Sequence, residues 1–314
     1  MSEKTITEHI SAVPSAASSS SSTTTTTTIT NITNITTHIY SLSKLDILPQ
    51  ILSEGILLAG SGAALLLQAA YPGIKSTFPE TSSSDSTTTL THNLTTTLET
   101  TLTHISILIC GSPHAKQTLL TNLHPPHPAS TSPPAKQTNP NPKLWLPATI
   151  YTTATDLYQR IYGSLSPSSA DSAYTEFGTV LHVLNHSAKD QWPASRLEFW
   201  RYWDKQVERL AVTGEAHRVA REVLYPPHQQ QGQSALLQGG RVMRVVIRAV
   251  TVEMLPPGVR EVYGLKSTGR TRALYRGVVR CVGGAVYPAM PGWVRGYPLR
   301  RVLGRNSGGW GVDA

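Results

Sequence analysis

Apolar side chains recur every three or four residues in several stretches of the chain, most clearly after Trp192. Ser195 and Glu198 have the spacing of a capping box, in which each side chain satisfies a backbone N–H of the first helical turn. The pattern therefore predicts a helix that begins after Ser195 and continues toward Tyr225. Its expected buried face consists of Leu197, Trp200, Trp203, Val207 and Leu210.

The same periodicity predicts further helices, and no run of alternating residues suggests strands. One helix is expected over 144–162 with Gly163 as its C-cap. Ser166 and Pro167 have the residue types of a helix start, and that helix should reach Leu184. Three more are expected near 241–254, 257–264 and 269–286. The predicted fold class is all-α, in a single globular multi-helix domain.

Residues 51–70 are strongly apolar, and Tyr71-Pro72-Gly73 ends the stretch. Its charge-free part is about 16 residues long, whereas a bilayer span needs about 20. We therefore expect a buried core helix, with a transmembrane helix as the alternative.

Composition adds an N-terminal arm to this domain. Residues 18–28 are a run of serines followed by a run of threonines, with too little apolar surface to offset the entropy of ordering. The dense prolines between His124 and Pro142 predict a loop. We expect a disordered low-complexity arm at 1–44, a helical catalytic domain at 45–305 and a flexible tail at 306–314.

The net charge of +8 is concentrated near the C-terminus. Residues 241–305 contain twelve arginines and Lys266 against Glu253 and Glu261. Because these arginines alternate with apolar residues instead of clustering, we expect no nucleic-acid partner. Peripheral contact with an anionic membrane surface remains an alternative.

The two cysteines and the N-terminus bear on the compartment. Cys110 and Cys281 lie far apart in apolar sequence surroundings, which predicts two buried free thiols and a reducing environment. No apolar segment follows Met1 as in a secretory signal. An intracellular location is expected, cytoplasmic or at the endoplasmic reticulum membrane.

Common catalytic motifs such as the P-loop, GxGxxG, HExxH and GxSxG are missing from the sequence. Histidines are the remaining candidates for site chemistry. His114, His124 and His127 fall around the end of the helix expected after Gly111. His182 and His186 are four residues apart, a spacing that can bind a metal but more often marks a surface pair.

The apolar landmarks, taken in order, resemble the catalytic domain shared by fungal MpaB-type oxygenases and bacterial rubber oxygenases (latex clearing proteins). The first is Leu66–Ile74, which resembles the family's Gln-x-x-His-Pro-Gly-Val signature, with Tyr71 at the histidine position. The others that match are Leu144–Tyr151, Gly178–Leu181, Trp192–Asp204, Leu255–Leu265, and Tyr287 to Pro298.

The resemblance implies an all-helical enzyme that binds haem b and splits carbon–carbon double bonds of isoprenoid chains with dioxygen. It implies that a histidine ligates the iron, at His127 or, as a close second, His124. It also implies that Thr101 lies near the oxygen-binding side. Thr97 occupies the position of the family's arginine, and Tyr71 is a candidate cofactor contact. Neutral imidazole is a common iron ligand, and an apolar interior suits both haem and an apolar substrate.

Two functions of different classes follow. The first is a haem-dependent oxygenase acting on an apolar, isoprenoid-like small molecule and dioxygen. The alternative is a non-catalytic helical relative that binds an apolar ligand or acts as a scaffold at a membrane surface. The oligomeric state does not follow from the sequence.

Overall fold

The structure is a computed structural model, and it describes residues 35–52, 60–78, 86–123, 142–184, 188–225 and 241–283. Within these ranges all regular structure is helical, which confirms the predicted all-α class. Besides a helix over 35–43 and two short 3-10 turns, the helices are α2 (Ile47–Leu52), α3 (Ser61–Ala69), α4 (Ser86–Cys110), α5 (Pro113–Leu123), α6 (Pro142–Tyr162), α7 (Pro167–Val183), α8 (Arg196–Val207), α9 (Gly214–Leu224), α10 (Arg241–Met254), α11 (Pro257–Val262) and α12 (Gly269–Gly283).

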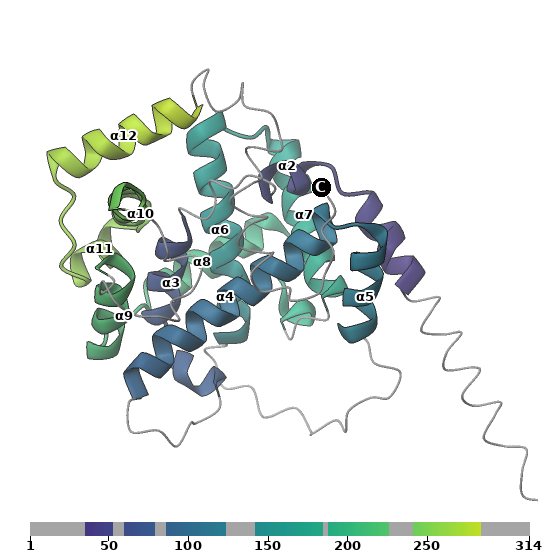
Figure 1. Cartoon of the computed structure of the whole chain (residues 1–314), viewed down its shortest axis with the longest axis horizontal. Coiled ribbons are helices and arrows are strands. Elements are labelled where there is room, and N and C mark those ends of the chain that lie inside the picture. Colours follow the sequence, from purple (N-terminus) through teal and green to yellow (C-terminus); the bar gives the residue numbers. More distant parts are fainter. Residues whose placement is uncertain are drawn as a thin grey trace, which may run out of the picture.

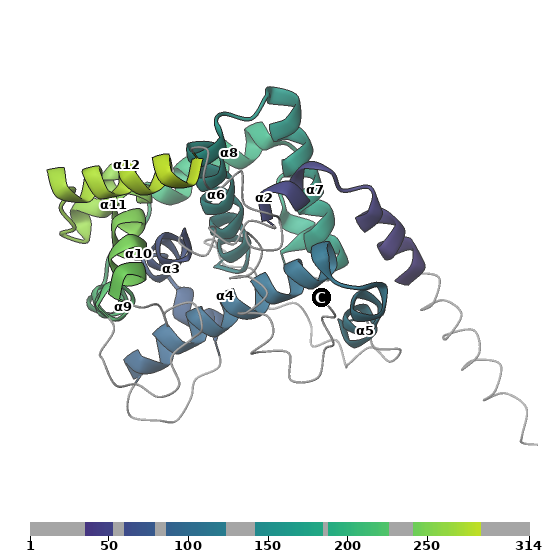
Figure 2. The same ribbon diagram turned by 45° about the horizontal axis from the view of Figure 1, so that its top comes forward.

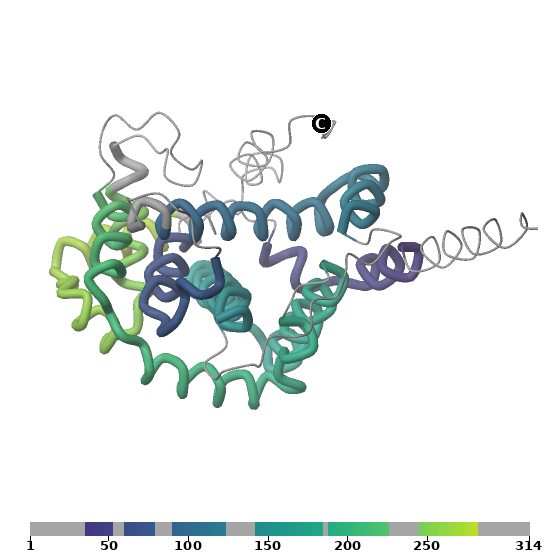
Figure 3. The backbone as a smooth tube through the Cα atoms, turned by 90° about the horizontal axis from the view of Figure 1, so that it is seen from below, coloured from purple at the N-terminus to yellow at the C-terminus, as the bar shows by residue number. Residues whose placement is uncertain are grey.

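Helix α3 is the centre of the domain and packs against α4, α6, α9 and α10. Helix α4 crosses the front of the molecule in Figure 1. In the turned view of Figure 3, α4 lies along one side and the α8–α9 stretch along the other, with α3 and α6 between them. Helices α10 to α12 gather at one end, and α2, α5 and α7 at the opposite end (Figures 1 and 2).

Every residue of α3 is buried, so the predicted core helix is present over 61–69. No helix in the described ranges is long and apolar enough to cross a membrane. Close packing of α3 depends on Gly62, where an added Cβ would lie 2.2 Å from the Thr251 hydroxyl of α10.

Groups distant in sequence bind backbone carbonyls at the C-terminal end of α3, including that of Leu66, which also accepts from the Ala70 N–H at 3.1 Å. The Trp145 indole N–H donates to Leu67 O at 3.0 Å, and the Tyr263 hydroxyl donates to Leu66 O at 2.7 Å. The backbone N–H of Ala211 donates to the carbonyl of Ala70, just past the helix, at 2.9 Å. Three distant segments therefore meet at the C-terminal end of α3.

Helix α8 begins as predicted, because the Ser195 side chain accepts a hydrogen bond from Glu198 N at 3.2 Å. Its predicted face is confirmed in part: Trp203 is buried, and Trp200, Val207 and Leu210 pack partly buried against the core. Leu197 was wrong, because it is 63% exposed and Phe199 is buried instead. The helix also ends at Val207, well before Tyr225. A second helix follows because Thr213 supplies a new N-cap through its side chain.

An aromatic cluster explains why Phe199 faces inward. Its ring lies 5.1 Å from that of Trp192 and 5.2 Å from that of Tyr151, which also contacts Tyr174 and Phe177. Such pairs add to the free energy of burying the rings themselves. Burial in this cluster raises the pKa of Tyr151 to about 12.

Other boundaries were predicted with mixed success. Gly163 adopts a left-handed conformation (φ 98°) directly after α6, as its expected C-cap role requires. Residues 35–43, assigned to the arm, are instead helical, and Leu42 is buried. Both cysteines are thiols outside any disulfide, but they are exposed and not buried. Cys110 is the last residue of α4, and Cys281 lies on the outer side of the amphipathic helix α12.

Candidate functional site

Thr97 and Thr101 lie one turn apart on α4, and both are half-buried. The Thr101 hydroxyl donates to the Thr97 carbonyl at 2.8 Å. Its proton is thereby used within the helix, while the oxygen keeps its acceptor capacity. His104 follows Thr101 by three residues, so all three side chains fall on one edge of α4.

The other edge of α4 is polar and buried. Thr95, Glu99 and Thr103 follow one another at four-residue spacing, with exposed fractions of 3%, 8% and 8%. The Thr95 hydroxyl donates to Thr91 O at 2.7 Å, whereas the Thr103 hydroxyl has no partner among the described residues. Buried polar groups cost free energy unless they are satisfied. Polar side chains therefore lie on both sides of the leucine face of α4.

His104 is a candidate that the sequence interpretation missed. Desolvation lowers its pKa from the ordinary value of 6.5, so the neutral imidazole is favoured near pH 7. A neutral imidazole can accept a hydrogen bond or bind iron. Its three-residue spacing from Thr101, just before the mostly apolar residues 105–109, was the available signal.

We expect His104 to make the fold sensitive to mild acid. The unfolded chain takes up a proton on this residue as the pH falls through about 6.5, while the folded state still resists it. The free energy of unfolding should therefore fall with pH in the wild type, and fall less in His104→Gln. Urea denaturation from about pH 7.5 to about pH 5.0 measures this difference. The matched control is His114→Gln on the exposed face of α5; equal pH profiles for His104→Gln and the wild type would refute the expectation.

Tyr71 lies just after α3 and is 2% exposed. Its ring stacks on Trp145 at a centroid distance of 5.2 Å, and Trp145 stacks in turn on Trp203 at 4.8 Å. The Tyr71 hydroxyl donates to Gln206 Oε1 at 3.3 Å. Tyr71 therefore has a clear packing role, and its contact with a cofactor stays a prediction.

A second polar pair lies beside this aromatic stack. Gln68 is 1% exposed, and its Nε2 donates to the Thr149 hydroxyl at 2.8 Å. Its Oε1 has no partner among the described residues. Thr149 in turn donates to Leu146 O at 2.7 Å, next to Pro147, which interrupts the hydrogen bonding of α6. The end of α3 is thus bound to α6 by polar as well as aromatic contacts.

The structure does not describe the predicted iron ligands. His124 and His127 fall outside the described residues, and α5 ends one position before His124. His182 is exposed on α7, and His186 lies outside the described residues. Within the ranges that the structure describes, no three His, Cys, Asp or Glu side chains form a group able to hold a metal ion.

The predicted residues therefore fall into two groups. Thr97 and Thr101 are hydrogen-bonded neighbours on α4, and the Tyr71 contacts described above run to α6 and α8. Helix α3, which packs against both α4 and α6, connects the two regions.

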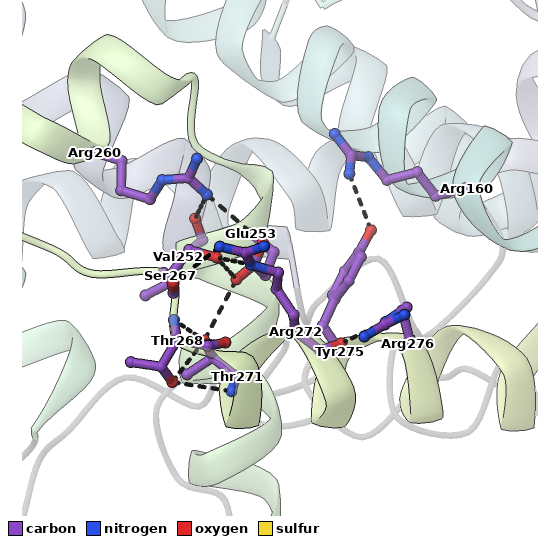
Figure 4. Close-up of polar contacts among 10 residues, drawn as sticks. All are labelled: Arg160, Val252, Glu253, Arg260, Ser267, Thr268, Thr271, Arg272, Tyr275 and Arg276. Atoms are coloured by element: carbon purple, nitrogen blue, oxygen red, sulfur yellow. Dashed lines mark hydrogen bonds and ion pairs between the residues drawn. The ribbon is translucent and has the colours of Figure 1, made fainter.

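A cleft of about 470 Å³ opens between α6, α8 and the α10–α11 segment. Its apolar surface includes Leu67, Trp200 and Trp203, so it reaches the aromatic stack of Tyr71. Two ion pairs line it as well: Arg160 with Asp156 at 2.9 Å, and Arg260 with Glu253 at 3.6 Å. Figure 4 shows Arg160 with Tyr275, and Arg260 with Val252 and Glu253.

A family model described as "ER-bound oxygenase mpaB/B'/Rubber oxygenase, catalytic domain" matches residues 48–284. The chain belongs to this family. The match spans α2 to α12 and includes Tyr71, Thr97, Thr101, His124 and His127. The expected resemblance is confirmed, and the family is one of oxygenase catalytic domains.

Two curated proteins are similar over a shorter stretch. They are Uncharacterized protein Mb2261 of Mycobacterium bovis and Uncharacterized protein Rv2237 of Mycobacterium tuberculosis. Each is 30% identical over 77 residues, which is 24% of this chain and 29% of the relative's length. No solved structure matches the chain.

Proposed function

We propose that this member of the family is a haem-dependent oxygenase that splits carbon–carbon double bonds of an apolar, isoprenoid-like substrate. One dioxygen and one C=C bond give two carbonyl groups, so the reaction balances without another reactant. The observation that carries the proposal is the family match over the helical domain that holds all the predicted site residues. We assign the iron ligand to His127, with His124 as the other candidate.

The described residues fit haem in their chemistry. Along one edge of α4 lie two hydroxyls and an imidazole favoured in its neutral form, beside buried leucines. Haem, when bound, supplies the activation of dioxygen. Thr97 offers a neutral hydroxyl where the family has an arginine, so this chain adds no fixed positive charge at that position.

A hydrogen bond within α4 fixes the orientation of the Thr101 hydroxyl. Because its proton is donated to the Thr97 carbonyl, Thr101 presents lone pairs toward any neighbouring donor. The leucines of α4 keep the surroundings apolar, which limits water and favours an uncharged substrate.

Oxygen uptake tests the proposed activity. Haem-reconstituted protein is mixed with squalene, an isoprenoid with double bonds, or with squalane, its saturated counterpart. We expect dioxygen consumption and carbonyl products with squalene alone. Saturable squalene binding without oxygen uptake would contradict catalysis and favour the alternative, a non-catalytic relative that binds an apolar ligand.

A second proposal concerns the outer helix α12. Arg270, Arg272, Arg276 and Arg280 are all exposed, and none forms an ion pair within the described part of the chain. No acidic residue occurs between Tyr263 and Gly283. Helix α12 also lies at the edge of the molecule (Figures 1 and 2).

We infer that α12 contacts anionic lipid headgroups, on an intracellular membrane such as the endoplasmic reticulum. Co-sedimentation should then occur with phosphatidylserine-containing vesicles at low salt. It should disappear at high salt or with neutral vesicles. Salt-independent binding to both kinds of vesicle would contradict this contact.

A further inference from the structure

Arg260 lines the cleft between α6, α8 and α11, and its guanidinium group makes only weak polar contacts there. Its side chain is 20% exposed, so most of it is removed from water. One guanidinium nitrogen, Nη1, approaches Val252 O at 3.4 Å and Glu253 Oε2 at 3.6 Å, both long contacts. The remaining N–H groups have no partner among the described residues, although a guanidinium carries five donors.

Glu253 is bound more firmly by other groups than by Arg260. Its Oε1 accepts from the Ser267 hydroxyl at 2.5 Å and from the Thr271 hydroxyl at 3.4 Å (Figure 4). These bonds hold the carboxylate toward α12. A partly buried charge with such loose pairing is unfavourable, so a further anion beside Arg260 would be stabilised.

Arg160, which also lines the cleft, differs from Arg260 in this respect. Its Nε lies 2.9 Å from both oxygens of Asp156, and its Nη1 donates to the Tyr275 hydroxyl at 3.2 Å. The Asp156 and Tyr275 contacts fix this guanidinium in place and neutralise it locally. The cleft therefore contains Arg160, which is held by strong hydrogen bonds, and Arg260, which has guanidinium N–H donors available for a ligand.

The rest of the cleft lining is suited to the hydrocarbon part of a ligand. Trp200, Trp203, Leu67, Met254 and Leu255 contribute aromatic or aliphatic surface. A volume of about 470 Å³ lies within the range of sites for small organic ligands. No residue from α4 lines the cleft.

We propose that this cleft binds an apolar molecule bearing one carboxylate, with the acid on Arg260 and the chain against Trp200 and Trp203. A planar guanidinium matches a carboxylate through two parallel hydrogen bonds, which an alcohol cannot make. None of Tyr71, Thr97 and Thr101 is among the residues that line the cleft, so either proposal can fail while the other stands.

Calorimetric titration of the full chain with decanoate, and with decan-1-ol as the uncharged counterpart, tests the site. The wild type should bind decanoate saturably and at least tenfold more tightly than decan-1-ol. Arg260→Gln should remove this preference and weaken decanoate binding about tenfold or more, as expected for loss of a charge-assisted pair. The matched control is Arg280→Gln on the exposed face of α12, which should bind as the wild type does.

Arg260→Gln leaves Glu253 without its arginine, so circular dichroism must show that the variant is folded. If it is not, the double variant Glu253→Gln/Arg260→Gln removes both charges together and should show the same loss. Equal affinity of the wild type for acid and alcohol would overturn the proposal. Equal effects of Arg260→Gln and Arg280→Gln would also overturn it, because they would indicate adsorption on the basic surface.

Discussion

Replacing Trp145 with alanine should lower the free energy of unfolding by about 3–5 kcal/mol. The side chain is completely buried, lies between the rings of Tyr71 and Trp203, and donates a hydrogen bond to Leu67 O. Truncation leaves a cavity between α3, α6 and α8 and leaves a helix-terminal carbonyl without its donor. Since domains of this kind are stable by only about 5–15 kcal/mol, this is a large fraction of the total.

Two further variants separate the contributions of Trp145. Trp145→Phe keeps most of the ring but loses the N–H, so it should cost clearly less than Trp145→Ala. Tyr40→Ala, at a side chain 62% exposed, should change stability by about 0.5 kcal/mol or less. Urea denaturation of the haem-free proteins provides all three values. A loss below about 1 kcal/mol for Trp145→Ala would show that the stack does not hold these helices together.

His127→Ala should lose most of its haem, with the Soret band disappearing from the purified protein. The side chain is assigned as the iron ligand, and alanine has no group that can bind iron. His124→Ala should keep the spectrum if His127 is the ligand. The reverse pattern would assign the iron to His124.

The control for these variants is His114→Ala, at an exposed histidine of α5. It should bind haem as the wild type does. Haem content is measured from the Soret absorbance per protein after reconstitution. A double variant, His124→Ala/His127→Ala, that still bound a full equivalent would remove both residues from the site and make His104 the next candidate.

Local signals in the sequence predicted much of the fold. The Ser195 cap, the Ser166–Pro167 start and Gly163 after α6 act through neighbouring residues only, and the structure contains all three. The ordered landmarks also identified the family. These features do not depend on how the helices pack.

Features that depend on packing were predicted less well. Helical periodicity placed Leu197 on the buried face of α8, but the aromatic partners on α6 and α7 select Phe199 instead. The cysteines lie in apolar sequence yet face outward, because apolar neighbours in sequence do not fix which side of a helix is covered.

In the candidate site, too, local features could be predicted and features that depend on packing could not. The family resemblance selected Thr97 and Thr101, and their four-residue spacing on α4 brings them into hydrogen-bond contact. His104 was missed because its burial depends on tertiary packing, not on a motif. The cleft beside Arg260 brings together α6, α8 and α11, far apart in sequence, so no local pattern indicates it.

The absorption spectrum of the purified wild-type chain after reconstitution with haem tests the central proposal most directly. If the chain is a haem-dependent oxygenase, it should bind haem in a one-to-one ratio and show a Soret band that shifts on reduction and again on exposure to carbon monoxide. A chain that binds no haem after reconstitution would contradict the proposal.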